Sequence, residues 1–347
     1  MNKTFCKIII IVFLVLCLIP SVGMLFAGPS GAAGNEILSP APRLERLDGT
    51  FNRNFLSEAS AWFDDRFALR QQLSAAWSGL NAFLFGCSVN DDVILGREGW
   101  LFFTDSLKDY VGELLPDEVI EAAARHIAEI QECCHENGAE FAFTVAPNKN
   151  SLYPEYMPRR FPAGNPRNVD RLVEKLSELG VKYVDLHEAF RKNEEVLYFQ
   201  TDSHWNSRGA ALAADHILPV LGMESGYFRG EFREGTDHSG DLFEMLYPSV
   251  KSREKDFDYC PGYSFRCTSD PQSGNAIEFS TENPSGTGRL LCWRDSFGIS
   301  LYPYLAESFS SADFSRSSQY DLERIRNGNY DAVVIEIVER NISWLAQ

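Results

Sequence analysis

Leu290-Leu-Cys-Trp-Arg-Asp-Ser-Phe-Gly298 joins a short apolar run to a helix-like segment, and Ser296 lies at the junction. A short apolar run that ends in a turn and a helix is typical of a buried strand in an α/β protein. A turn between a strand and a helix exposes a serine at the edge of the sheet, where backbone N–H groups can bind an oxyanion. Ser296 is therefore our candidate nucleophile, although the same turn also suits a structural role in capping a helix.

A carboxylate and an imidazole occur together earlier in the chain, in Thr201-Asp-Ser-His-Trp-Asn206. Asp202 and His204 are two residues apart, so in an extended segment both side chains point to the same face. A carboxylate in this position can fix the tautomer of the imidazole, which then takes a proton from a serine. Asp202, His204 and Ser296 therefore form a candidate triad for acyl transfer.

Helical and strand-like segments alternate from Pro116 onward. We expect helices over 116–137, 166–179 and 207–221, and strands over 140–146, 182–186, 289–293, 312–314 and 331–338. This alternation predicts an α/β fold with a mostly parallel sheet covered by helices on both faces. Functional groups of such sheets gather beyond the carboxyl ends of the strands, and both Ser296 and the Pro147-Asn148-Lys149 turn follow such an end.

The remaining segments have other compositions. Residues 28–43 are rich in Gly, Ala and Pro and are expected to form a linker. Apolar residues at helical spacing over 51–85 predict a helical hairpin that packs on the core, and 92–103 predict a β-hairpin. Residues 223–288 contain many Gly, Ser and Asp and predict an irregular excursion over one edge of the sheet. We therefore expect a single catalytic domain over 44–347.

The N-terminus carries an uncharged stretch, residues 8–27, preceded by Lys3 and Lys7. As a helix these twenty residues would span roughly 30 Å, enough to cross a bilayer. The basic residues place the short N-terminal side in the cytoplasm. We favour an uncleaved single-pass membrane anchor over residues 1–27, with secretion after cleavage near Ala27, Ala32 or Ala33 as the alternative. Either way, the catalytic part is expected outside the cytoplasm.

The net charge, the cysteines and the possible metal ligands indicate which partners and cofactors to expect. The formal net charge is −17 and the body of the chain has no basic cluster, which argues against binding nucleic acid. Cys260 and Cys267 enclose a short loop and could form a disulfide in an oxidising compartment. Asp202 and His204 could bind a metal with His238 or Asp241, but no third ligand has convincing spacing. We therefore predict no metal and no cofactor.

Six segments of the chain together resemble one known family. They are residues 96–103, 147–158, 201–206, 240–242, 294–298 and 338–340. In this order they resemble the SGNH-hydrolase-like proteins of alginate O-acetylation, AlgX and AlgJ, and the related "DHHW" group of exported bacterial proteins. The resemblance implies a three-layer α/β/α fold with Asp202, His204 and Ser296 as the triad. Their order in the chain is permuted relative to ordinary SGNH esterases.

The resemblance also implies a function. It suggests an extracytoplasmic, membrane-tethered O-acetyltransferase that acetylates a cell-surface or secreted polysaccharide through an acyl-Ser296 intermediate. The acetyl donor would then be supplied by a membrane-bound O-acyltransferase. The alternatives are a carbohydrate O-acetylesterase, in which water replaces the sugar, and a catalytically silent glycan-binding or assembly protein, against which the intact triad argues.

The chain departs from ordinary SGNH esterases at the oxyanion hole, whose usual Gly and Asn blocks are not recognisable. Asn148 or Lys149 could supply a donor, or could be structural. Tyr153 and Trp205, like Trp100, Tyr156 and Trp293, could stack on a sugar or belong to the core. Asp241 is a further pocket candidate that could instead brace a loop. Glu339 and Arg340, at the end of the last strand, are expected to form a structural ion pair.

Overall fold

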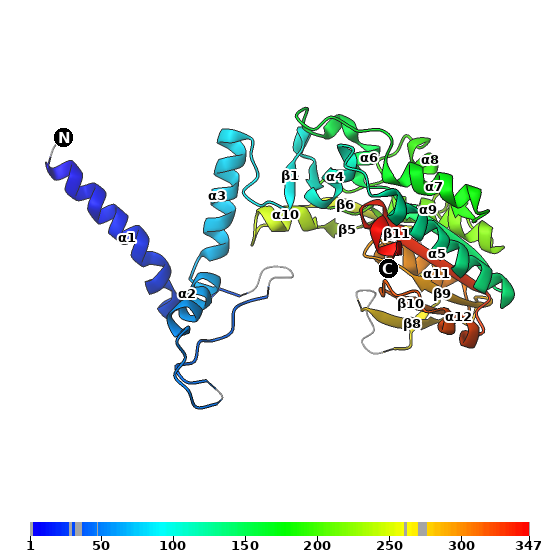
Figure 1. Cartoon of the computed structure of the whole chain (residues 1–347). Coiled ribbons are helices and arrows are strands. Elements are labelled where there is room, and N and C mark those ends of the chain that lie inside the picture. Colours follow the sequence, from blue (N-terminus) through cyan, green and yellow to red (C-terminus); the bar gives the residue numbers. More distant parts are fainter. Residues whose placement is uncertain are drawn as a thin grey trace. The chain divides into compact units, whose positions relative to one another are not determined.

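The computed structural model describes residues 3–27, 30–31, 37–46, 48–259, 262–269 and 276–346 (Figure 1). The chain divides into two compact units. The first comprises Met1–Asp91 and Phe243–Ser252, and the second comprises Asp92–Leu242 and Arg253–Gln347. The catalytic domain predicted over 44–347 includes parts of both units and remains a prediction.

The first unit contains the helices α1 (Lys3–Ala27), α2 (Phe55–Arg66) and α3 (Arg70–Phe85). The stretch Phe5–Met24 of α1 is long and apolar enough to cross a membrane and is 0% buried, a result that a signal sequence would also give. The two helices expected within 51–85 are present as α2 and α3. α2 has no buried residue and α3 buries Ala75 and Ser78. That this pair packs on the core remains a prediction.

The second unit is built on a seven-stranded sheet with the strand order β4-β3-β11-β9-β10-β8-β7. Five neighbouring strands are parallel, and β8 and β7 add an antiparallel edge. The bounds are β3 Glu140–Ala146, β4 Tyr183–Val184, β7 Arg266–Cys267, β8 Glu278–Glu282, β9 Arg289–Trp293, β10 Ser311–Ser315 and β11 Ala332–Val338. The predicted mostly parallel sheet is therefore confirmed.

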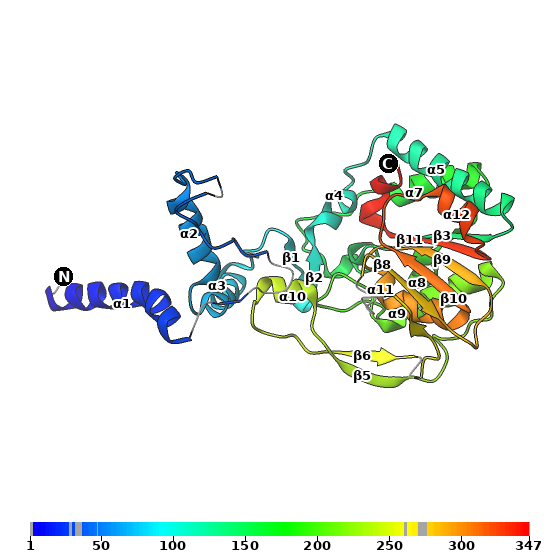
Figure 2. The ribbon, with the colours of Figure 1, turned by 90° about the horizontal axis from the view of Figure 1, so that it is seen from below.

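Successive side chains of the central strands enter two separate cores, because a strand alternates its side chains between faces. In β3, Phe141 and Phe143 pack in one core, whereas Ala142 and Ala146 pack in the other. The first core is shared with α5, α7 and α12, and the second with α8, α9 and α11. Figure 2 shows these two groups of helices on opposite sides of the strands. The three-layer α/β/α arrangement is thus present.

The helices of the second unit follow their apolar patterns. α5 places seven buried residues at helical spacing, which explains why its bounds lie within one residue of the expected ones. The helix bounds are α4 Leu107–Tyr110, α5 Asp117–Glu136, α6 Lys149–Leu152, α7 Asn168–Glu178, α8 Leu186–Arg191, α9 Ser207–Ile217, α11 Gly298–Ser308 and α12 Leu322–Gly328. Short 3₁₀ turns lie at Arg97–Gly99, Thr104–Ser106, Pro154–Tyr156, Leu218–Leu221 and Glu339–Ala346.

Helix α9 is held close to the preceding segment. The Asn206 side chain accepts a hydrogen bond from the Gly209 backbone and caps the helix. A Cβ atom at Gly209 would lie 2.5 Å from the carbonyl oxygen of Leu197, so only glycine allows this approach. The start of α9 therefore fixes the segment that carries Asp202 and His204.

Residues 223–288 contain more regular structure than the expected irregular excursion. They form a two-stranded antiparallel ribbon, β5 (Arg233–His238) with β6 (Glu254–Asp258), the helix α10 (Asp241–Leu246), and the edge strands β7 and β8. The predicted hairpin at 92–103 is present as β1 (Val93–Leu95) paired with β2 (Leu101–Phe103). Of the cysteine pair proposed for a disulfide, Cys260 lies outside the described residues and Cys267 is a free thiol.

Candidate active site

Ser296 lies in the turn between β9 and α11, at the carboxyl end of its strand. The buried carboxylate of Asp295 holds this turn, because it accepts hydrogen bonds from the backbone N–H groups of Phe297 at 2.9 Å and Val338 at 2.8 Å. Asp295 therefore bonds to the backbone. The turn presents the Ser296 hydroxyl at the sheet edge, the location expected from the sequence.

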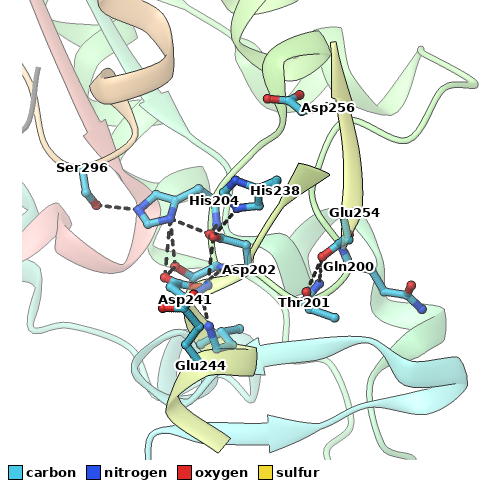
Figure 3. A network of polar contacts seen from close by, with 12 residues as sticks. Gln200, Thr201, Asp202, His204, His238, Asp241, Glu244, Glu254, Asp256 and Ser296 are labelled. Carbon is cyan, nitrogen blue, oxygen red and sulfur yellow. Dashed lines mark hydrogen bonds and ion pairs between the residues drawn. The ribbon is translucent and has the colours of Figure 1, made fainter. Parts of the chain in front are cut away.

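Asp202 and His204 lie on a loop closed by a β-bridge between Tyr198 and Trp205. This loop brings the two side chains to Ser296 (Figure 3). Nε2 of His204 lies 2.8 Å from Oγ of Ser296, and Nδ1 of His204 lies 2.7 Å from Oδ1 of Asp202. The three residues thus form a continuous hydrogen-bonded chain with the geometry required for a serine nucleophile, a base and its orienting carboxylate.

The carboxylate of Asp202 is almost fully buried and uses both of its oxygens. Oδ1 also accepts the backbone N–H of His204 at 2.9 Å, and Oδ2 accepts Nε2 of His238 at 2.8 Å and the backbone N–H of Asp241 at 3.0 Å. Burial alone would raise the pKa of Asp202, but the hydrogen bonds from His204 and His238 hold it well below its ordinary value. Asp202 is therefore a stable anion.

The pKa of His204 is raised above its ordinary value. Burial favours the neutral ring, but the hydrogen bond and negative charge of Asp202 outweigh burial and favour the imidazolium. The carboxylate of Asp241 adds a smaller contribution, with its Oδ2 3.6 Å from Nδ1 of His204. A ring with this environment can accept a proton from Ser296 and hold it during the reaction.

His238 is the residue that sequence reasoning missed in this role. It lies on β5, bonds to the free oxygen of Asp202, and stacks on the ring of Phe199 with 3.8 Å between centroids. The sequence suggested His238 only as a possible metal ligand. The sequence gives no sign that His238 lies near Asp202, because β5, which carries His238, has few apolar residues and could not be recognised as a strand.

Asp241 braces the same loop. Its carboxylate accepts hydrogen bonds from the backbone N–H of Ser203 at 2.7 Å and from the Ser203 hydroxyl at 2.6 Å. Potential ligand atoms of Asp202, His204 and Asp241 lie within 4.8 Å of one another, a spacing that could hold a metal ion. The nitrogen and oxygen atoms involved already serve the hydrogen bonds described above. The absence of a metal therefore stays a prediction.

Lys149 and Asn148 follow β3 at the same sheet edge. The ammonium of Lys149 donates to the carbonyl oxygens of Gln200 at 2.8 Å and Asp202 at 2.7 Å, which fixes the loop that carries Asp202 and His204. Complete burial lowers the pKa of Lys149 to about 7 against the opposing charge of Asp202. Asn148 is fully buried, and neither its side-chain nitrogen nor its oxygen has a hydrogen-bond partner among the described residues. Asn148 is thus an amide with unused hydrogen-bonding capacity on both of its polar atoms.

The aromatic candidates are mostly structural. Trp205 is fully buried and donates from Nε1 to the Phe297 carbonyl at 3.1 Å, so it supports the Ser296 turn and offers no face to a sugar. Trp293 is equally buried. The Tyr153 hydroxyl accepts the backbone N–H of Leu197 at 2.9 Å, and its half-buried ring lies 4.7 Å from that of Trp100. These contacts indicate that Trp205, Trp293 and Tyr153 belong to the core and do not stack on a sugar.

Glu339 forms a buried ion pair, but its partner is not the neighbouring Arg340. Its carboxylate lies 3.0 Å from Arg167 and 3.2 Å from His187. The guanidinium of Arg340 lies over the ring of Phe297 at 5.4 Å. Both residues open the 3₁₀ turn that follows β11, and the expected pairing of Glu339 with Arg340 was wrong.

The fold and the site define an SGNH-hydrolase-like protein. Residues 93–277, more than half of the chain, match the family described as "SGNH hydrolase-like domain, acetyltransferase AlgX". The chain therefore belongs to this family. The family resemblance stated from the sequence is confirmed.

Curated relatives include the probable alginate O-acetylases AlgJ of Pseudomonas syringae and Pseudomonas fluorescens. The first is 25% identical over 204 residues, which cover 56% of this chain and 51% of the relative. The second is 24% identical over 229 residues, which cover 59% of this chain and 56% of the relative. The chain thus spans about half the length of these relatives.

Solved structures agree on the fold. PatB1 of Bacillus cereus superposes with a TM-score of 0.58 at 21% identity, covering 72% of this chain and 96% of that chain. A DHHW family protein from Eubacterium siraeum superposes with a TM-score of 0.54 at 16% identity, covering 72% and 95%. The O-acetyltransferase domain of Pseudomonas putida AlgJ gives a TM-score of 0.50 at 16% identity, covering 72% and 92%. At these identities the likeness concerns the fold.

Proposed function

We propose that this protein is an extracytoplasmic O-acetyltransferase that acetylates a cell-surface or secreted polysaccharide through an acetyl-Ser296 intermediate. The hydrogen-bonded chain from Asp202 through His204 to Ser296, with distances of 2.7 and 2.8 Å, is the observation that carries this proposal. Membership in a family named for an acetyltransferase, and relatives named as probable alginate O-acetylases, support the reaction class.

In the first half-reaction, Oγ of Ser296 attacks the carbonyl carbon of the acetyl donor, and Nε2 of His204 takes the hydroxyl proton. The bond between the acetyl carbon and the leaving group then breaks, and His204 returns its proton to the leaving group. Asp202 holds Nδ1–H throughout and stabilises the imidazolium that forms. The product is an acetyl ester on Ser296.

In the second half-reaction, a sugar hydroxyl attacks the acetyl-enzyme. His204 takes the hydroxyl proton, and the sugar oxygen bonds to the acetyl carbon. The bond between that carbon and Oγ of Ser296 then breaks, and His204 returns the proton to Oγ. Water in place of the sugar would release acetate, which is the esterase alternative. A sugar bound beside the ester competes well with water because binding gives its hydroxyl a large effective molarity.

The oxyanion of both tetrahedral intermediates needs hydrogen-bond donors. We assign this role to the Ser296 backbone N–H and, as the candidate helper, the side-chain amide of Asn148. Lys149 is the weaker candidate because its ammonium already donates to two carbonyl oxygens. Asn148 has an amide with no other partner among the described residues.

The proposal also covers where the protein is located and what supplies the acetyl group. The apolar helix α1 would hold the protein at the cell membrane with its catalytic part outside, and cleavage of this segment would release it instead. A membrane-bound O-acyltransferase would supply the acetyl group from the cytoplasmic side. A catalytically silent glycan-binding protein would have no need of the assembled Asp202, His204 and Ser296.

The test supplies an activated acetyl ester with and without oligosaccharides. A transferase should release the leaving group of the ester in a burst and then turn over slowly, because the acetyl group stays on Ser296 and water reaches this acetyl-enzyme poorly. A suitable oligosaccharide should accelerate turnover and gain an acetyl group on a hydroxyl, detected by mass spectrometry. Fast, steady hydrolysis that no oligosaccharide affects, with acetate as the sole product, would make the esterase the better assignment.

A further inference from the structure

A cleft with a volume of about 610 Å³ lies between the β5–β6 ribbon and the helices α9 and α11. Its lining includes Ser207 from α9 and Ser300 from α11. Ser207 is three residues beyond His204, and Ser300 is four residues beyond Ser296. Ser207 is the first residue of α9 and Ser300 lies in the first turn of α11, so the cleft is close along the chain to both His204 and Ser296. A polymer bound there could place a hydroxyl at Ser296.

The ribbon wall of this cleft is acidic. It presents the carboxylates of Glu234, Asp256 and Asp258 and a single guanidinium, that of Arg233. Arg233 is already paired with Asp258 at 3.0 Å. The negative charge of Asp256 also acts on His238 in the site, and Figure 3 shows Asp256 in the same network view. Glu234 is likewise paired with Lys255 of β6 at 2.8 Å, so the negative charge of Asp256 gives the cleft the same sign as the net charge of the chain.

The carboxylate of Asp256 keeps hydrogen-bonding capacity for a ligand. Asp256 accepts one hydrogen bond on each oxygen, from the backbone N–H of Ser207 at 3.0 Å and its hydroxyl at 2.7 Å. A carboxylate has about four acceptor positions, so further donors can bind. Sugar hydroxyl and ammonium groups are such donors, whereas a uronate carboxylate is an acceptor of like charge. Like charges brought together in an interface oppose binding.

An aromatic side chain completes the lining. Tyr263 is 38% exposed, so its ring offers an apolar face and a polar tip at the cleft. A pyranose ring has the matching character, with an apolar C–H face and hydroxyl groups at its edge. Aromatic residues with one apolar and one polar side suit such a mixed surface. Ring packing and carboxylate acceptors together describe a glycan site.

We propose that this cleft is the acceptor subsite and that it takes a neutral or amino-sugar glycan in preference to a polyuronate. The proposal rests on the proposed acetyl transfer and adds the chemical class of the acceptor. The relatives named as probable alginate O-acetylases carry the name of a polyuronate, alginate. The acceptor proposed for this chain is of a different chemical class.

The experiment uses the full chain in detergent, an activated acetyl ester, and three acceptors: a neutral glucan oligomer, a glucosamine oligomer and an oligouronate. The measured quantity is kcat/KM for each acceptor. The wild type should prefer the first two acceptors by about tenfold or more. Glu234→Lys reverses one charge of the cleft and should shift the ratio about fivefold or more toward the oligouronate.

The matched control is Glu188→Lys. Glu188 lies on α8, outside the cleft, and like Glu234 it is exposed and paired with a lysine; the side chains are 60% and 64% exposed. The control should leave the acceptor ratio unchanged. A second cleft variant, Tyr263→Ala, should raise KM for the neutral oligomer several-fold without reversing the preference.

Two results would overturn the inference. In the first, the wild type uses the oligouronate and the neutral oligomer equally well. In the second, Glu234→Lys leaves the acceptor ratio unchanged, as the control Glu188→Lys does. Both presuppose an acetyl group on Ser296, which mass spectrometry of the same samples detects. Acetyl-Ser296 with no dependence on the cleft removes only the acceptor assignment, whereas no acetyl on Ser296 removes the proposed function as well.

Discussion

Asp202 and His238 are joined by a hydrogen bond of 2.8 Å between Oδ2 and Nε2, on the carboxylate oxygen opposite to the one that binds the ring of His204. The carboxylate therefore lies between two imidazoles, one from the loop that carries Asp202 and His204 and one from the β5–β6 ribbon (Figure 3). Binding at both oxygens restrains rotation of the carboxylate. A restrained carboxylate keeps the ring of His204 aligned with Ser296.

Replacing His238 by alanine should lower kcat about tenfold and change KM little, since His238 acts on the alignment of the base. A hydrogen bond to a charged group contributes roughly 1.5–3 kcal/mol, and the exposed part of His238 lets water replace some of it. His238→Gln keeps an N–H donor and should retain more activity than His238→Ala. Steady-state kinetics checks both variants. Wild-type kcat in His238→Ala would remove His238 from the mechanism.

The rate of acetyl transfer should rise with pH through a midpoint above 6.5, the ordinary pKa of histidine. In the proposed mechanism the neutral ring of His204 is the base. Asp202 raises the pKa of that ring, so the ring becomes protonated, and activity falls, at a higher pH than for an ordinary histidine. The pH dependence of kcat/KM measures this value in the free enzyme. Asp202→Asn should move the midpoint down. A wild-type midpoint at or below 6.5 would contradict the assignment.

Ser296→Ala and His204→Ala should each reduce activity by about a thousandfold or more, and the double variant should lose little beyond either single variant. Members of a triad act as a unit, so removal of one disables the other. Circular dichroism of each variant controls for folding. Multiplicative losses in this cycle would show that the two side chains act independently.

Deletion of residues 1–36 should yield a soluble protein that keeps its activity on an activated ester. The membrane-length part of α1 is 0% buried and belongs to the first unit, whereas Asp202, His204 and Ser296 belong to the second. Cell fractionation should show the full chain at the membrane and the shortened chain outside it. Precipitation of the shortened protein in every buffer would mean that the N-terminal segment stabilises the fold.

The central strands could be predicted from sequence because they are buried on both faces. β9, for example, reads as the continuous apolar run that such a strand requires, and its predicted and observed bounds are identical. β5 could not be predicted, because Arg-Glu-Gly-Thr-Asp-His has no apolar alternation. Its pairing with β6 depends on contacts between segments that are distant in the sequence.

The candidate site, too, could be predicted only where its residues are close together in the sequence. The spacing of Asp202 and His204 placed both groups on one loop, and the strand-to-turn pattern placed Ser296 at the sheet edge. The support around them is non-local: His238 reaches Asp202 from another ribbon, and Glu339 pairs with Arg167. Side chains that meet only through tertiary packing leave no periodic signal in the sequence.

The most direct test of the account is to locate the acetyl group after the protein meets an activated acetyl ester. Wild-type protein, quenched early in the reaction and digested, should carry one acetyl group on the peptide that contains Ser296. Ser296→Ala should carry none, and Asp313→Asn, a change on β10 outside the triad, should be labelled like the wild type. Reproducible acetylation of another residue, or equal labelling of Ser296→Ala, would contradict the assignment of Ser296 as the nucleophile.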